Sequence, residues 1–298
     1  MTTDHRLQQL FDDPIDQITV LDPGYSGHAS DVWLVKTAAG ECVVRSSRLK
    51  EAPTHEFWWG CYDLFGIDPR SMQHFAANAA MLGTLADIPA PRIHKHQLIE
   101  GREYLVVEKM NGQAFGSFAT QSDALLHQLG VWLARVHAQR CDYFGNLAGD
   151  PIGRSESFHT HLARTMKQLV ELDCTNDPKI KAQLGAMLHA LDVLSVPAHF
   201  CPIFIDLDSS QFLIHEGMLS AVVDVEAYAV GPRELDFVGL EYVLDERAAI
   251  PFLEGYATVL APPDITDYRT VYRYFYRLLG VQGSADLDLW LAQRALFL

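Results

Sequence analysis

Residues 204–236, FIDLDSSQFLIHEGMLSAVVDVEAYAVGPRELD, hold the densest set of candidate functional side chains in the chain. Asp206 stands five residues before the amide Gln211 and eighteen before Asp224, and each aspartate adjoins an apolar, strand-like run. Two carboxylates and an amide at this spacing can meet across a short hairpin. Such a cluster offers oxygen ligands for divalent cations and a base for a hydroxyl proton. Phosphoryl transfer needs these parts, because its catalysis is mostly positioning and charge neutralisation.

The composition is that of an ordinary globular protein. The 298 residues are 49% hydrophobic and 20% charged, which is enough for one large domain or two lobes. The net charge of -15 argues against affinity for nucleic acid or anionic membranes. The five cysteines are scattered without CxxC spacing, so neither a disulfide framework nor a structural zinc site is expected. The start lacks a secretory signal and no run is as long as a transmembrane helix, so we expect a cytoplasmic protein.

The first third of the chain predicts mainly strands. Apolar or alternating runs at 31–36 and 41–45 flank Ala38-Ala39-Gly40, which is a hairpin signature. A helical period covers 71–85, and Pro89 and Pro91 follow it. Further strands are expected at 17–21, 92–98 and 103–108.

After Asn111-Gly112 the chain turns helical, and this is where we place the lobe boundary. Ser122 or Asp123 can cap a helix that runs on through DALLHQLGVWLARVHAQR. Further helices are expected at 158–172, 179–194 and 270–279. The sequence therefore predicts an α+β fold with two lobes: residues 1–110 form a small antiparallel-sheet lobe, and residues 111–298 form a larger, mainly helical lobe.

Two features of the N-terminal lobe could bind phosphates. The loop 24–30 carries Gly24, Ser26, Gly27 and Ser30, and such loops let backbone N–H groups approach phosphate closely, although most are only turns. Arg45 on the next hairpin could neutralise nucleotide phosphates, or simply face water.

Two other features are open to a functional and a structural interpretation. Glu108 and Met110 follow the apolar run YLVV, where the backbone of a hinge could pair with the edge of a purine or merely leave the strand. His137 lies on or beside the apolar stripe of its helix, and we expect a packed or hydrogen-bonded histidine that braces the catalytic loop.

Taken in order, VVEKMNG, LARVH, FIDLDSSQFL and VVDVEAYAVGPRELDFVGL resemble the aminoglycoside phosphotransferase and choline kinase-like family, which has a protein-kinase-like fold. The resemblance covers nearly the whole chain. It implies transfer of the γ-phosphate of ATP or GTP to a small-molecule hydroxyl, with Mg²⁺ as cofactor. Asp206 would take the catalytic position, and Gln211 and Asp224 the metal positions. Asp208 and Glu226 would join the metal shell or the substrate site, and Asp236 would support the loop.

The chain departs from the family pattern at several positions. Phe204 and Ile205 replace the His-Gly before the catalytic aspartate, and Asp208 replaces a second histidine. Gln211 replaces an asparagine and is one methylene longer. Arg45 replaces a lysine, and Asn78 stands where the glutamate that pairs with this lysine is expected, which would leave Arg45 free to bind phosphate. The aromatic segment 49–69 is expected either to cover the nucleotide cleft as a lid or to fill the core.

These departures leave three functions open. A small-molecule kinase is favoured because both carboxylates are present. A binding module that senses a nucleotide or partner without turnover is the alternative, and a metal-dependent hydrolase is the third. The acceptor is unspecified, although acidic residues of the large lobe could receive an amine; we favour the interpretation that they form a solvated face. They are Glu226, Glu234, Glu241, Asp245 and Glu246.

Overall fold

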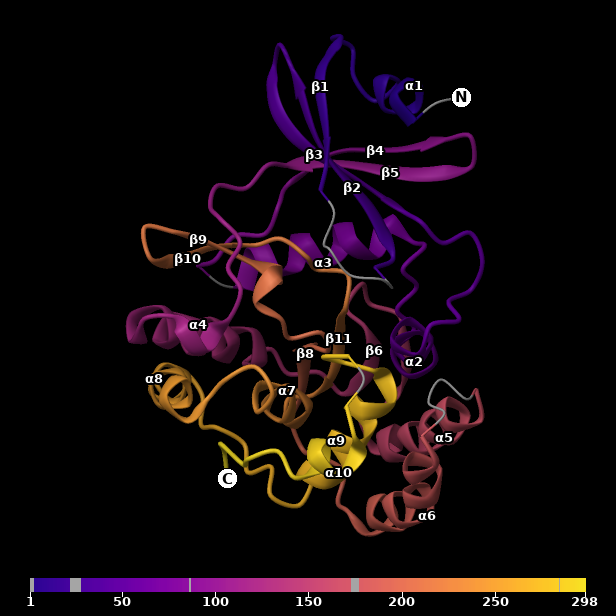
Figure 1. Ribbon diagram of the computed structural model, residues 1–298, viewed down its shortest axis with the longest axis vertical. Coiled ribbons are helices and arrows are strands. Elements are labelled where there is room, and N and C mark those ends of the chain that lie inside the picture. The colour runs from indigo at the N-terminus through magenta and orange to yellow at the C-terminus, as the bar shows by residue number, and fades with distance from the viewer. Residues whose placement is uncertain (1–2, 22–27, 86, 173–176, 284) are drawn as a thin grey trace.

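The computed structural model describes residues 3–21, 28–85, 87–172, 177–283 and 285–298. A small sheet stands above a larger body of helices, with helix α3 (Met72–Leu85) and the hairpin β9–β10 (Phe212–His215, Met218–Val222) between them (Figure 1). The predicted α+β architecture, with a small antiparallel sheet and a larger, mainly helical part, is therefore confirmed. The N-terminal sheet has the order β1-β2-β3-β5-β4 and is antiparallel throughout. Its strands are β1 (Ile15–Val20), β2 (Ser30–Thr37), β3 (Gly40–Ser47), β4 (Ile93–Ile99) and β5 (Arg102–Glu108).

The expected hairpin is present, and its turn explains the glycine. Thr37 pairs with Gly40 across the turn of β2 and β3, and Gly40 has a φ of 128°, a conformation that glycine adopts without a Cβ clash. Because side chains alternate along a strand, Val44 faces outward into a cluster that helix α1 (Thr3–Gln8) covers with Leu7. Arg45 then faces inward, next to Leu105 of β5 and toward the large lobe.

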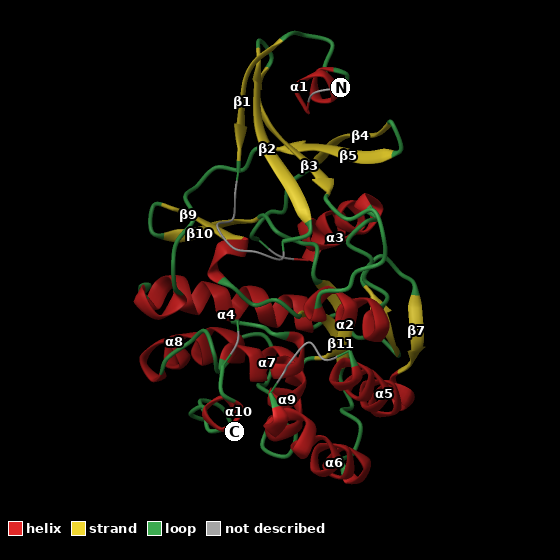
Figure 2. Cartoon of the chain, turned by 45° about the vertical axis from the view of Figure 1, so that its right-hand side comes forward, coloured by secondary structure: helices red, strands yellow, loops and turns green. Residues whose placement is uncertain are grey.

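Helix α2 (Glu56–Phe65) belongs by sequence to the N-terminal part but packs against the C-terminal helices (Figure 2). It contacts helix α5 (Phe158–Glu171), helix α9 (Arg269–Leu279) and strand β6 (Tyr143–Asn146). A Cβ on Gly60 would collide with the Leu279 side chain, so α2 and α9 approach closely at this glycine. Trp58 and Phe65 are buried in the main core, which favours core filling over a lid for these two side chains of the 49–69 segment.

The C-terminal part is built on a four-stranded sheet of order β7-β6-β11-β8 and on the helices around it. Helix α4 begins after Ser122, whose hydroxyl accepts the N–H of Leu125, as the capping prediction required. Helices α4 and α8 cross where Gly130 of α4 and Gly255 of α8 bring the two backbones together. The remaining elements are β7 (Pro151–Arg154), β8 (Phe200–Phe204), β11 (Tyr228–Pro232), α4 (Asp123–His137), α6 (Pro178–Val193), α7 (Glu234–Leu240), α8 (Glu246–Ala257) and α10 (Leu287–Leu291).

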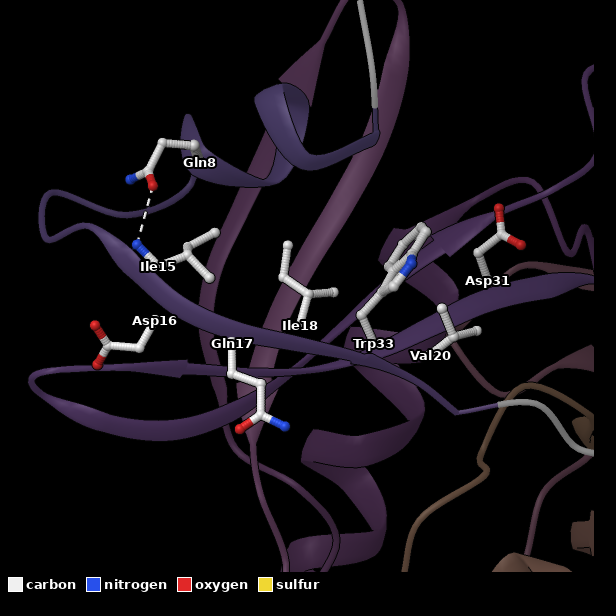
Figure 3. A pocket seen from close by; sticks show the side chains of 8 residues that line it. All are labelled: Gln8, Ile15, Asp16, Gln17, Ile18, Val20, Asp31 and Trp33. Atoms are coloured by element: carbon white, nitrogen blue, oxygen red, sulfur yellow. Dashed lines mark hydrogen bonds between the residues drawn. The ribbon is translucent and has the colours of Figure 1, made fainter.

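A hollow of about 650 Å³ opens on the outer face of the N-terminal lobe (Figure 3). Residues of α1, β1 and the start of β2 line it, among them Asp16, Asp31 and Trp33. None of the predicted site residues contributes to its lining, so it is separate from the candidate site. Over the described parts of the chain, every helix is too short or too polar to span a membrane.

Candidate functional site

Strand β8 delivers Asp206 to the end of the C-terminal sheet. Two backbone anchors fix the chain just before it: the N–H of Phe204 donates to both oxygens of Asp236 at 2.9 Å each, and the N–H of Ile205 donates to the carbonyl of Ala227 at 3.2 Å. These bonds hold the loop from below and from the neighbouring strand. The Asp206 carboxylate therefore projects from a fixed backbone.

Asp236 is in turn held by the expected histidine. His137 Nε2 lies 3.0 Å from Asp236 Oδ2, and His137 Nδ1 lies 2.9 Å from the hydroxyl of Tyr256. Both side chains of the pair are completely buried. Burial raises the pKa of Asp236 and lowers the pKa of His137, so burial disfavours the charged form of both groups. His137 thus acts on the catalytic loop through Asp236.

Gln211 joins the two ends of the hairpin. Its Nε2 donates to the backbone carbonyl of Asp206, and its own backbone carbonyl accepts the N–H of Val223 at 2.7 Å. Asp224 follows directly, so the hairpin β9–β10 brings Asp206, Gln211 and Asp224 together as its spacing predicted. Asp208 lies in the same loop and accepts the N–H of Ser210 at 2.8 Å, which makes it the cap of the short helical turn before β9.

The carboxylates of this cluster oppose one another. Burial, followed by the negative charges of Asp224 and Asp208, raises the pKa of Asp206 to about 7, against a smaller opposite effect of Gln211. A carboxyl group with a pKa this close to neutral can exchange a proton with a hydroxyl at neutral pH. Among the described residues, no three His, Cys, Asp or Glu side chains gather closely enough to form a metal cage.

Arg45 reaches across from the N-terminal lobe to the hairpin. Its Nη2 lies 3.1 Å from Asp224 Oδ1 and 2.8 Å from Glu226 Oε1. Burial lowers the pKa of the guanidinium, but the two carboxylates raise it by more, so Arg45 is a fixed cation. The expectation that Arg45 would be free of carboxylate partners is therefore wrong. Its partners come from the segment between β10 and β11 and not from a helix.

The other predicted nucleotide contacts are only partly described. Gly24, Ser26 and Gly27 lie outside the described residues. Ser30 is buried and donates its hydroxyl to Glu226 Oε1 at 2.5 Å. At the hinge, Glu108 ends β5 and its carboxylate accepts Arg92 Nε at 2.8 Å, while the partly buried Met110 lies in the connection that follows.

Three of the five acidic side chains that were expected to form a solvated face are buried, whereas Asp245 and Glu246 are exposed as expected. Glu226, Glu234 and Glu241 are buried, and Glu241 lies between Arg269 and Arg273 inside the core. Asp245 caps α8 through the N–H of Ala248. The sequence does not show that Glu226 and Glu241 have arginine partners in the folded protein, so it could not predict their burial.

Sequence reasoning missed the floor of the site. Burial, together with the charge of Asp206, raises the pKa of the Cys61 thiol of α2. Burial and nearby acidic groups that include Asp206 do the same for the hydroxyl of Tyr276 on α9. Both side chains are fully buried, so residues of α2 and α9 lie near Asp206 on the core side. No local motif marks either residue, because they meet Asp206 only through the packing of α2 against α9.

Comparison with known proteins places this geometry in a family. The model of the phosphotransferase enzyme family matches residues 23–274. No curated protein sequence is significantly similar to the chain. The macrolide 2′-phosphotransferase MphH from Brachybacterium faecium is similar in structure, with 16% identity, 96% of this chain and 95% of that chain covered, and a TM-score of 0.62.

Two aminoglycoside phosphotransferases are also similar in structure. APH(2″)-IIIa in complex with GDP and kanamycin has 16% identity, 93% and 89% coverage and a TM-score of 0.66. ADP-bound APH(2″)-Ib has 14% identity, 99% and 98% coverage and a TM-score of 0.63. At these identities the structures show the shared fold, and the family match over most of the chain shows its membership. The chain belongs to the phosphotransferase enzyme family.

Proposed function

We propose that the protein transfers the γ-phosphate of ATP or GTP to a hydroxyl group of a small molecule. The observation that carries this proposal is the convergence of Asp206, Gln211 and Asp224 around one hairpin, with the pKa of Asp206 raised to about 7. A base and a pair of oxygen ligands next to it are the protein groups that phosphoryl transfer uses. Membership of the phosphotransferase family supports the same chemistry.

Each side chain of the site has a proposed role. Asp206 orients the acceptor hydroxyl and takes its proton, and Asp224 and Gln211 hold Mg²⁺ through side-chain oxygens. Mg²⁺, when bound, would supply positive charge that neutralises the phosphates. Asp236 and Asp208 keep the catalytic loop in shape through the backbone N–H groups that they accept.

The N-terminal lobe would hold the nucleotide. We propose that Arg45 of β3 and Ser30 of β2 contribute to phosphate binding. The proposal also includes Gly24, Ser26 and Gly27, which lie outside the described residues. Glu108 and Met110 offer the backbone of the hinge to the purine edge. Two contacts support this role: Ser30 donates its hydroxyl to Glu226, and Arg45 donates to Asp224.

The acceptor is proposed to be an aminoglycoside or another amino-alcohol. The support is the net charge of -15, which favours cationic partners, and the structural likeness to a kanamycin-bound phosphotransferase. The likeness to a macrolide phosphotransferase widens the class of acceptors to test. A nucleotide-consumption screen over aminoglycosides, macrolides and small amino-alcohols, with ATP and with GTP, identifies the substrate.

The site assignment is tested with two variants once an acceptor is found. Asp206→Asn is expected to lower kcat by about 100-fold or more, because general-base assistance is typically of that size. Asp224→Ala is expected to abolish transfer and to weaken Mg²⁺-dependent nucleotide binding as well. Asp192→Asn removes an exposed carboxylate of α6 and should leave kcat unchanged. Wild-type activity in either active-site variant would refute the assignment.

A binding module without turnover is the second candidate. The observation that favours it is the ion pair between Arg45 and Asp224, because Arg45 then occupies a carboxylate needed for the metal. This function predicts binding of a nucleotide that Mg²⁺ does not strengthen, and no transfer to any acceptor of the screen. Transfer to one acceptor would exclude it.

A further inference from the structure

Helix α3 cannot supply a carboxylate to Arg45. Its sequence, MQHFAANAAMLGTL, contains no aspartate or glutamate. The guanidinium carbon of Arg45 instead stands 4.6 Å from the centre of the Phe75 ring, which gives a cation–π contact but no charge compensation. A cation that is 7% exposed needs an anionic partner, because an unpaired buried charge is costly.

Both anionic partners come from the segment after β10, and they are not equivalent. Glu226 is 8% exposed and lies at 2.8 Å, whereas the Asp224 side chain is 42% exposed and lies at 3.1 Å from the same Nη2 atom. Both carboxylates raise the pKa of Arg45, but Glu226 is the closer and the more buried of the two. Attraction between charges is stronger where water is excluded, so the geometry favours Glu226 as the partner that stays with Arg45. Its Oε1 also accepts the Ser30 hydroxyl, and these two donors fix its position.

Helix α3 contributes to the same arrangement through Asn78. The buried Asn78 donates its Nδ2 to the carbonyl of Val225 at 2.8 Å. Val225 stands between the two carboxylates, so this bond holds the backbone that carries both. Arg45 Nε is buried without a hydrogen-bond partner, so the guanidinium retains donor capacity beyond its two ion pairs.

We propose that Glu226 is the positioning residue that replaces the missing helix carboxylate. It holds Arg45 in place and compensates its charge, so that Asp224 can leave Arg45 and bind Mg²⁺ with the nucleotide. This inference rests on the proposed function. Glu226 would affect Mg²⁺-dependent nucleotide binding indirectly, by fixing the position of Arg45. Without Glu226, Arg45 would have Asp224 as its one carboxylate partner among the contacts described above, and would compete with Mg²⁺ for it.

The test is a double-mutant cycle read by calorimetry of ADP or GDP binding over a series of Mg²⁺ concentrations. Glu226→Gln is expected to raise the Mg²⁺ concentration for half-maximal binding by about tenfold, the effect of one charged hydrogen bond. In an Arg45→Met background the same substitution should change this concentration by less than about twofold, because the competing cation is absent. Asp31→Asn, which removes a carboxylate that pairs with Arg48 and Arg102, should leave it unchanged.

The metal-free protein gives an independent readout. Glu226→Gln should lower the melting temperature because it strips a buried cation of its main partner, and Arg45→Met combined with Glu226→Gln should recover much of the loss. If Glu226→Gln alone does not fold, the Mg²⁺ requirement of Arg45→Met is compared with that of the double variant Arg45→Met, Glu226→Gln. A rise in Mg²⁺ requirement in that background would overturn the inference.

Different results would contradict the proposed function and the role of Glu226. A wild-type protein that binds neither ADP nor GDP in the presence of Mg²⁺ would overturn the proposed function and this inference together. A wild-type protein that binds with Mg²⁺, beside a Glu226→Gln variant with the same Mg²⁺ requirement, would overturn the inference alone.

Discussion

Gln211 shows how one added methylene changes a site. Its Nε2 donates to the backbone carbonyl of Asp206, so the longer side chain braces the proposed catalytic residue, while its Oε1 is an oxygen of the kind that Mg²⁺ prefers. Asp206 itself is held where its charge is unfavourable, beside Asp224 and Asp208. Because burial and neighbouring negative charges disfavour its ionised form, Asp206 should lower the free energy of unfolding when it is ionised.

The raised pKa of Asp206 should make the free energy of unfolding depend on pH. Its pKa in the folded protein, about 7, is higher than in the unfolded chain, so the folded state binds more protons between the two values and stability falls as pH rises through this range. Asp206→Asn removes this cost and should raise the melting temperature by roughly 2–4 °C or more at about pH 8. At about pH 5, where the wild-type carboxyl is already protonated, the difference should nearly vanish.

Thermal unfolding of wild type and variant at the two pH values measures this effect. Asp192→Asn, on an exposed helix face, serves as the control and should show no such pH-dependent gain. An Asp206→Asn variant that is no more stable than wild type at the higher pH would show that the carboxylate is not destabilised by its surroundings.

At the scale of elements, two glycines set the contact between helices α4 and α8. A Cβ on Gly130 would collide with the carbonyl oxygen of Phe252, and a Cβ on Gly255 would collide with that of His127. Backbone atoms cannot rotate away as side chains do. The helices therefore have to separate if either glycine gains a methyl group, and α4 also carries His137, which acts on the catalytic loop.

Gly130→Ala should therefore lower the free energy of unfolding by about 2 kcal/mol, the middle of the range for overpacked cores. Gly185→Ala is the matched control, because this glycine lies in helix α6 with open space around its Cβ position. There the better helix propensity of alanine should raise the free energy of unfolding by up to about 1 kcal/mol. Urea unfolding of both variants provides the measurement, and a neutral Gly130→Ala would mean that the helices cross less closely than described.

Local patterns predicted the elements that depend on nearby residues. The β2–β3 hairpin, α3, α4 with its Ser122 cap, and the meeting of Gln211 and Asp224 across the β9–β10 hairpin all follow from periodicity and turn chemistry. The docking of α2 on α9 depends on Gly60, whose role appears only when the two helices meet. The pairing of Arg45 with Glu226 was missed for the same reason, because 181 residues separate the partners.

At the scale of the whole molecule, the N-terminal sheet and the C-terminal body meet at the proposed metal site. Arg45 of β3 and Asn78 of α3 both bond to the segment that carries Asp224 and Glu226. The backbone of Gln113, in the connection between the lobes, pairs with Ile214 of β9 and ties this connection to the same hairpin. A ligand that binds Asp224 therefore acts on contacts from both parts of the chain.

The central claim is that Asp224 binds the metal of a metal–nucleotide complex between the two lobes. Calorimetric titration of ADP and GDP into wild type and Asp224→Ala, with and without Mg²⁺, tests it most directly. The account predicts that Mg²⁺ strengthens nucleotide binding to wild type and has little effect on Asp224→Ala, while binding without Mg²⁺ is similar for both. Equal strengthening by Mg²⁺ in the two proteins, or no nucleotide binding by wild type, would contradict it.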